Sequence, residues 1–149
     1  MKIYLDTCCY NRPLDDQSQI EIQLETIAKL NIQEKVRGDM YELVWSYMLN
    51  LENKANPHED KRKAVQIWEN ITKFYCKPSQ KILNKGIELK KLGIKPKDTL
   101  HIACAISTEC DYFITCDKWI LKKDIKEIKV INPIDFVRDV NNYEDWKHN

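Results

Sequence analysis

Four acidic residues, widely separated in the chain, each lie just beyond a predicted strand or in the first turn of a predicted helix: Asp6, Glu52, Asp98 and Asp117. If the fold gathers them in one pocket, their like charges repel, and a divalent cation is the usual reason that such clusters persist. Ligands that are all oxygen favour Mg²⁺ or Mn²⁺ over zinc. One or two such ions could activate a water molecule and stabilise the leaving oxygen of a phosphodiester.

Single acids in this set also have purely structural interpretations. Asp6 could be a turn former, and Asp98 could be a residue that the helix dipole favours at a helix start. Glu42 lies at or within a predicted strand, and Asp111 precedes one and should lie at the opposite edge of the sheet, so we discount both. His101, one helical turn after Asp98, is either a packed histidine or a group that shifts charge near the site.

The strands that must position the acids are short and mostly apolar, and they are predicted at residues 2–5, 41–46, 112–115 and 129–131. The two later runs are continuously apolar, which is typical of interior parallel strands. Strands that alternate with helices indicate an α/β layered domain with a mostly parallel sheet. Ligands of such sheets bind beyond the carboxyl ends of the strands, so Asp6 and Asp117 should emerge on the same rim.

A long helix is predicted to start near Ser18, which could cap it, and to end at Gly38-Asp39. Its apolar residues recur at helical spacing: Ile20, Leu24, Ile27 and Leu30. A short helix that includes Glu52 follows the second strand, and residues 59–75 again show helical spacing.

Residues 79–92 form the next predicted helix, which Gly93 closes as a C-terminal signal. Four of its apolar residues are expected to face inward: Ile82, Leu83, Ile87 and Leu92. Pro96 suits the first turn of a following helix, because its missing N–H would be unpaired there anyway. That helix is apolar nearly all round, so it should be buried. A last short helix is expected from Pro133.

The net charge of +1 conceals a strong segregation of charge along the chain. Residues 1–60 have a balance of −5, residues 61–97 of +9 and residues 98–149 of −3. A near-neutral protein with one concentrated basic segment can hold a polyanion locally, although a solvated helix surface explains the same pattern. Three of the lysines are spaced four apart and would stack on one face of a helix: Lys77, Lys81 and Lys85.

The six cysteines include no CxxC pair and the three histidines are scattered, so we expect neither a structural zinc site nor a disulfide framework. Cys104 and Cys116 are interpreted as small hydrophobic residues. No apolar run approaches the roughly 18 residues that a membrane span needs. An acid within the first six residues leaves no room for a signal-peptide core, and we therefore expect a cytoplasmic protein.

Several motifs together resemble those of the PIN-domain nucleases. They are Ile3-Tyr4-Leu5-Asp6-Thr7, Val44-Trp45-Ser46 with Glu52 six residues after the serine, the run from Lys97 to Ala105 (KDTLHIACA), the run from Phe113 to Asp117 (FITCD), and the closing run from Val130 to Phe136. The resemblance covers residues 2–137, nearly the whole chain. Its most specific parts are the KDTLHIACA run and the pair formed by Thr115 and Asp117.

This resemblance implies a three-layer α/β sandwich with a mostly parallel central sheet. The length of the chain fits one domain, expected over residues 1–140, and the polar residues 141–149 are expected to form a tail. It also implies Mg²⁺ or Mn²⁺ as cofactor and endonucleolytic cleavage of RNA. The four acids of the family match Asp6, Glu52, Asp98 and Asp117, and Thr115 matches a supporting contact near the metal.

RNA is the expected polyanion, and Lys77, Lys81 and Lys85 are the residues expected to contact it. Many family members are the toxin half of a bacterial toxin–antitoxin pair. An antitoxin protein and a homodimer are therefore open as partners, although nothing in these residues identifies an antitoxin surface.

Two rival functions fit parts of the pattern. A non-catalytic RNA-binding module on the same scaffold would use the basic segment alone, but such a surface gains nothing from carboxylates that face phosphates. A phospho-acceptor signalling domain needs a pair of adjacent acids directly after the first strand, whereas Asp6 is followed by Thr7-Cys8-Cys9. The favoured hypothesis is an RNA-cleaving enzyme, and it depends on the site rather than on the fold.

Overall fold

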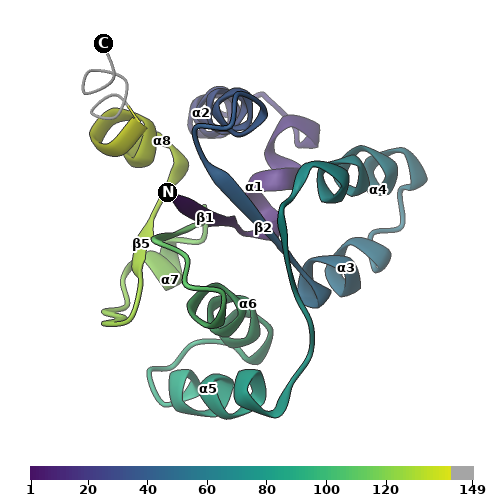
Figure 1. The fold of residues 1–149 in the computed structure, drawn as a ribbon. Helices are drawn as coiled ribbons and strands as arrows, with labels where there is room; N and C mark the ends of the chain where they lie inside the picture. Colours follow the sequence, from purple (N-terminus) through teal and green to yellow (C-terminus); the bar gives the residue numbers. More distant parts are fainter. Residues whose placement is uncertain (142–149) are drawn as a thin grey trace.

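The computed structural model describes residues 1–141, and its centre is a five-stranded sheet in which all neighbouring strands are parallel (Figure 1). The strands are β1 (Lys2–Leu5), β2 (Glu42–Ser46), β3 (Phe74–Cys76), β4 (Tyr112–Ile114) and β5 (Lys129–Ile131). Their order across the sheet is β3-β2-β1-β4-β5. With helices on both faces, this is a three-layer α/β arrangement, so the predicted fold class is confirmed.

β1 lies in the middle of the sheet because its side chains can be buried on both faces. Ile3, Tyr4 and Leu5 have no exposed surface, and Phe113 and Ile114 on neighbouring β4 have none either. A strand that is covered on both faces has no solvent-exposed side, which explains why these runs are continuously apolar and do not alternate between apolar and polar residues.

Helices cover the two faces of the sheet unequally. Figure 1 shows α2 (Ile20–Arg37) and α8 (Pro133–Phe136) on one face, and α5 (Gln80–Lys90) and α6 (Pro96–Ser107), which pack against each other, on the other. The remaining helical segments are α1 (Thr7–Asn11), the 3₁₀ turns η1 (Arg12–Leu14) and η2 (Ile67–Ile71), α3 (Tyr47–Lys54), α4 (Glu59–Gln66), α7 (Lys118–Leu121) and the π-helical turn η3 (Val137–Asn141).

Local signals in the sequence set the ends of several helices. The hydroxyl of Ser46 accepts a hydrogen bond from the Leu49 N–H at the start of α3, and Ser79 caps α5 in the same way. Pro96 occupies the first turn of α6, as predicted. Gly93, with φ of 83°, adopts the left-handed conformation after α5 that other residues avoid, so this predicted helix end is confirmed.

The structure corrects the predicted helix over residues 59–75. Regular helix ends at Gln66, a 3₁₀ turn follows, and the chain then forms the edge strand β3, which pairs with β2. Phe74-Tyr75-Cys76 is too short a run for its strand character to stand out beside the helical spacing that precedes it. The start of α2 also differs, because its N-cap is Gln19, without a side-chain hydrogen bond, rather than Ser18.

The apolar residues that recur along α2 do not face the core. Ile20, Leu24, Ile27 and Leu30 are all exposed, Ile20 to 73%. The buried face is made of Glu25, Ala28, Lys29, Ile32, Gln33 and Val36. Glu25 accepts a hydrogen bond of 2.9 Å from Arg12 Nε in η1, and Lys29 Nζ lies 5.2 Å from the centre of the Trp68 ring. Partners from other segments therefore allow two charged residues to share the buried face of α2 with apolar ones.

The inward face of α5 was also predicted only in part. Ile82 is buried as expected, but Leu83, Ile87 and Leu92 are exposed. Gly86 and Leu89 complete the buried face. A Cβ on Gly86 would lie 3.1 Å from Cδ2 of Leu100, so the close approach of α5 and α6 selects the smallest residue at this position.

Two further expectations concern the ends of the chain and membranes. Residues 142–149, most of the predicted polar tail, lie outside the described residues. Within residues 1–141, no helix has both the length and the apolar character that crossing a bilayer requires.

Candidate active site

The carboxyl ends of β1 and β4 place Asp6 beside Thr115. Because Leu5 pairs with Ile114, the Asp6 N–H donates to the Ile114 carbonyl at 2.9 Å. Asp6 Oδ2 accepts a hydrogen bond from Thr115 Oγ1 at 2.8 Å, and Oδ1 accepts one from the Thr7 N–H at 2.8 Å. Asp6 and Thr115 are both buried, so these bonds hold the carboxylate in one direction at the rim.

Asp117 is tied to the same threonine. Its N–H donates to Thr115 Oγ1 at 3.1 Å, and its Oδ1 accepts from the N–H of Trp119 at 2.8 Å, which caps α7. Among the described residues, its Oδ2 accepts no hydrogen bond. One oxygen of Asp117 therefore has a structural role, and the other is left for a ligand.

Glu52 lies at the end of a buried chain of hydrogen bonds that crosses the sheet. Glu52 Oε1 is 2.7 Å from His101 Nε2, and His101 Nδ1 is 2.6 Å from the Tyr4 hydroxyl. The Tyr4 hydroxyl lies 2.6 Å from Ser46 Oγ, which already accepts from Leu49 N–H. His101 has no exposed surface, so its ring orientation is fixed and fixes that of Glu52.

Neighbouring groups shift the pKa values of His101 and Glu52 in this chain of hydrogen bonds. Burial lowers the pKa of His101, but the hydrogen bond to Glu52 and the charge of Asp6 outweigh it and leave the pKa above its usual value. Burial raises the pKa of Glu52, but His101 outweighs it and leaves that pKa low. Both shifts favour a protonated imidazole beside an ionised carboxylate, an arrangement in which Nε2–H donates to Glu52.

Among the described residues, Asp98 is the one acid of the four whose carboxylate has no hydrogen-bonding partner. It lies in the first turn of α6, where the N-cap residue Lys95 makes no side-chain cap. Within residues 1–141, no hydrogen bond or ion pair reaches its carboxylate. Asp98 is partly buried, and within this range it forms no hydrogen bond of the kind that holds the other three acids in place.

Crowding of the carboxylates is visible in their pKa values. Burial raises the pKa of Asp98 to about 6, and repulsion from Asp6, Asp117 and Glu52 adds to the rise. Burial also raises the pKa of Asp6 to about 7, with a further rise from Cys8 that His101 and Thr115 oppose. The structure thus brings Asp6, Glu52 and Asp117 within electrostatic range of Asp98.

Three of the acids open into one pocket at the carboxyl rim of the sheet, which we call the carboxylate pocket. Its volume is about 840 Å³, and it is lined by Thr7, Asn11, Glu52, Ala55, Asn56, Lys95, Pro96, Lys97, Asp98 and Asp117. Asp6 is buried directly beside the lining residue Thr7. Two exposed lysines, Lys95 and Lys97, thus line the same pocket as three acids, an arrangement that suits a phosphate group held next to a bound cation.

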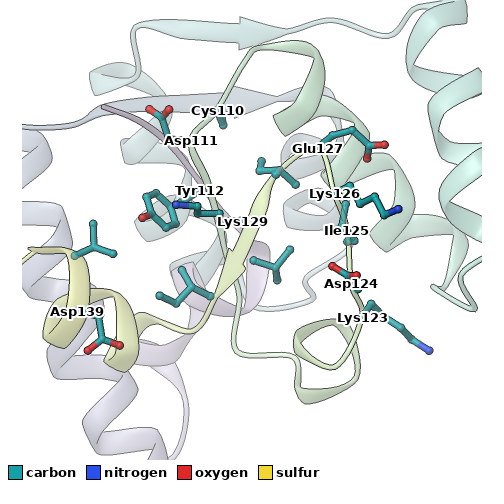
Figure 2. A pocket seen from close by; sticks show the side chains of 14 residues that line it. Cys110, Asp111, Tyr112, Lys123, Asp124, Ile125, Lys126, Glu127, Lys129 and Asp139 are labelled. Carbon is teal, nitrogen blue, oxygen red and sulfur yellow. The ribbon is translucent and has the colours of Figure 1, made fainter.

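A second hollow, of about 870 Å³, lies around β5 and the loops that lead into it (Figure 2). Figure 2 shows Asp111, Tyr112 and Lys129 on one side of it, and the run from Lys123 to Glu127 on the other. Its charged groups alternate in sign, and it includes none of the four acids. Asp111 accepts from the Lys2 N–H at the amino rim, as its place before β4 predicted.

The lysines assigned to RNA do not form the predicted stack. Lys81 and Lys85 lie one turn apart on α5, but Lys77 precedes Ser79, the N-cap of that helix. The prediction that all three share one helical face is therefore wrong, because β3 and Pro78 keep the chain extended until the helix begins. Lys85 Nζ also forms an ion pair of 2.8 Å with Glu88.

Several supporting residues were missed at the level of sequence. The Tyr4 hydroxyl in a fully buried strand needs a hydrogen-bonding partner, and this requirement could have pointed to His101 and Ser46. Lys95 and Lys97 belong to the basic segment, but nothing in the sequence distinguished them from its other lysines as residues near the acids. Their place on either side of Pro96, at the start of α6, is what brings them to the pocket.

The donor set of the carboxylate pocket fits a hard divalent cation. All four acids offer oxygen, one of them is unpaired, and repulsion among them would be relieved by positive charge. In the described part of the chain, no three of their oxygens lie within 4.8 Å of one another. A cation held by three or more of the acids would therefore have to draw these oxygens together.

Comparison with known proteins supports the assignment of the fold. No protein-family model matches the sequence, and the search of curated proteins finds no relative. The chain is similar to the structure of VapBC2 from Rickettsia felis bound to a DNA fragment from their promoter, with a TM-score of 0.57, 16% identity, and coverage of 89% of this chain and 98% of that one. It is also similar to FitAcB from Neisseria gonorrhoeae, with a TM-score of 0.55, 13% identity, and coverage of 88% and 97%.

The chain has a PIN-like fold. The motifs that resembled PIN-domain nucleases thus lie on the expected architecture, with the predicted acids on segments around the carboxyl rim of a parallel sheet. At identities of 16% and 13%, the comparison establishes this fold and leaves the chemistry to be argued from the residues.

Proposed function

We propose that this PIN-like protein is an endoribonuclease that depends on Mg²⁺ or Mn²⁺ and cleaves RNA phosphodiester bonds in the carboxylate pocket. The observation that carries the proposal is the unpaired carboxylate of Asp98, crowded by Asp6, Asp117 and Glu52 at the carboxyl rim. Four acids in electrostatic contact destabilise a protein that has no cation to bind there. A purely RNA-binding surface would have no use for such a cluster.

Each residue of the pocket would have a separate task. Asp6, Glu52, Asp98 and Asp117 would hold the cation, which when bound supplies an activated water and charge stabilisation at the phosphate. Thr115 holds Asp6 and the backbone of Asp117 in place. His101 keeps Glu52 ionised and oriented through the proton at Nε2. Lys95 and Lys97 would bind the flanking phosphates.

A protein partner is part of the same proposal. Both neighbours described above are toxin–antitoxin complexes, and this chain exposes apolar side chains on α2 and α5 where a partner or a second copy could bind. We infer that the chain acts as the toxin-like member of such a pair and forms a homodimer. Light scattering of the purified chain, alone and after co-expression with the product of a neighbouring gene, tests both points.

The decisive experiment is cleavage of a mixed RNA pool by the purified chain, with and without Mn²⁺, followed by mapping of the new ends. We expect internal cuts that need Mn²⁺, that disappear in Asp98→Asn, and that persist in the control Asp124→Asn. Asp124 is an exposed acid of the second hollow, outside the carboxylate pocket. Binding of RNA without any cleavage would instead favour the non-catalytic RNA-binding module.

A further inference from the structure

Three cysteine side chains meet next to the carboxylate rim, and we call them the thiol cluster: Cys8, Cys9 and Cys116. Their Sγ atoms all lie within 4.8 Å of one another, and those of Cys9 and Cys116 are 3.8 Å apart. Cys8 and Cys9 belong to α1, whereas Cys116 follows β4. Within residues 1–141, this is the only group of three or more Cys, His, Asp or Glu side chains that meets this distance limit.

We propose that the thiol cluster is a binding site for a soft monovalent cation, Cu⁺, held by three sulfur atoms. Thiolate ligands select soft ions of this kind, in contrast to the oxygens of the carboxylate pocket. With metal–sulfur bonds of about 2.3 Å, as in zinc sites, two sulfurs on one ion lie roughly 3.8 to 4.0 Å apart. Cys9 and Cys116 already have this separation, and all three thiols are free.

The surroundings of the cluster favour three ligands over four. Cys9 has no exposed surface and Cys116 only 6%, while Cys8 is partly exposed. Asp6 Oδ2 lies 3.6 Å from Cys8 Sγ, but it does not join the set within the 4.8 Å limit. Structural zinc sites are almost always four-coordinate, so this set suits Cu⁺ better than Zn²⁺.

Cations on both sides of the cluster offset part of the charge of the bound state. Binding breaks three S–H bonds, forms three Cu–S bonds and releases three protons to solvent, without any electron transfer, and it leaves a net charge of −2 on the site. Part of this charge is offset by Arg12 beside Cys116 and by Lys29 beside Cys9. Glu25, also close to Cys116, is already paired with Arg12. The Cys116 N–H donates to Cys8 Sγ at 3.2 Å and would stabilise a thiolate there.

The test is anaerobic titration of the metal-free chain with Cu⁺ in competition with a chromophoric Cu⁺ chelator, together with X-ray absorption of the loaded protein. We expect one equivalent, bound to three sulfurs. Cys9→Ser should weaken binding by more than about 100-fold, which exceeds the usual effect of losing an outer contact. The control Cys110→Ser, a buried cysteine outside the cluster, should bind as the wild type does.

Two outcomes would overturn the assignment. One is Cu⁺ binding by two sulfurs that persists in Cys9→Ser. The ligands would then be Cys76 and Cys104, which contact each other. The other is zinc bound as tightly as Cu⁺ with a fourth ligand. If Cys9→Ser does not fold, alkylation of the wild-type chain decides, since Cu⁺ should protect Cys8, Cys9 and Cys116 and leave the remaining cysteines unchanged. None of these readouts depends on RNA cleavage.

Discussion

The carboxylate pocket and the thiol cluster are built from the same two strand ends, yet they present opposite kinds of donor. Asp6 is two residues from Cys8, and Cys116 directly precedes Asp117. Asp117 lines the open pocket, whereas its neighbour Cys116 is only 6% exposed. After β1 the order is reversed, since Asp6 is 5% exposed and Cys8 is partly exposed. The turn that follows each strand, and not nearness in sequence, therefore decides which of two neighbouring side chains meets solvent.

The two sites also differ in how closely their donors approach. The Sγ atoms of Cys9 and Cys116 are 3.8 Å apart, whereas within residues 1–141 no three carboxylate oxygens from the four acids lie within 4.8 Å of one another. The thiol cluster is consequently preformed in the metal-free chain, and the carboxylate pocket is not. This difference predicts that a hard ion such as Mn²⁺ acts through the carboxylate pocket and a soft ion such as Cu⁺ through the thiol cluster.

The largest expected effect is on RNA cleavage by Asp98→Asn. Loss of one cation ligand removes roughly 4 kcal/mol of charge stabilisation, so the cleavage rate should fall by at least about 1,000-fold. Because the substitution also removes a repelled charge, the metal-free variant should melt no lower than the wild type. Cleavage assays and thermal melts in chelator measure the two effects. A variant that melts clearly lower and still cuts RNA would contradict this role for Asp98.

The second prediction concerns stabilisation by Mn²⁺. A ligand that binds only the folded state adds about 2.7 kcal/mol at 100 times its Kd, so the wild type should melt higher as Mn²⁺ rises. Asp6→Asn should lose most of this increase, whereas Cys9→Ser should keep it. Melting curves and calorimetric titration across a range of Mn²⁺ concentrations provide the measurement. Equal Mn²⁺ binding by the wild type and Asp6→Asn would remove Asp6 from the site.

The third prediction concerns pH in the metal-free chain. The pKa values of Asp6 and Asp98, about 7 and about 6, are raised on folding, so the folded state holds protons that the unfolded state has already lost. The contribution of these two groups to stability is therefore present below about pH 4 and is lost as the pH rises to about 7. Denaturant melts in chelator between pH 4.5 and about 7.5 should show a decline that Asp6→Asn/Asp98→Asn flattens. An unchanged slope in that double variant would show that the decline has another source.

The smallest expected effect concerns the lysines outside both sites. If Lys81 and Lys85 contact RNA, each lost phosphate contact should reduce the salt dependence of single-strand binding by about 0.7 in log–log slope. Lys97→Ala, at the carboxylate pocket, should produce a similar reduction and also slow cleavage. Binding titrations at several salt concentrations measure the slopes. If Lys81→Ala/Lys85→Ala changes neither affinity nor slope, this face of α5 is only solvated.

Much of the PIN-like architecture could be predicted from the sequence alone, because its signals are local. Continuous apolar runs predicted the central strands, and Pro96 and Gly93 predicted helix ends through fixed backbone preferences. The order of strands and helices then placed Asp6 and Asp117 on one rim, since parallel strands share a carboxyl edge. Their role as cation ligands remains a prediction.

Only the tertiary structure could decide which faces are buried and which side chains meet. Arg12 and Trp68, which come from other segments, contact Glu25 and Lys29 on the inner face of α2. The contact between His101 and Glu52 joins residues 49 positions apart. The thiol cluster likewise brings Cys116 to a helix more than one hundred residues earlier in the chain. Spacing along a sequence carries no information about such distances, because they arise from the pairing of β1 with β4 and from the packing of helices against the sheet.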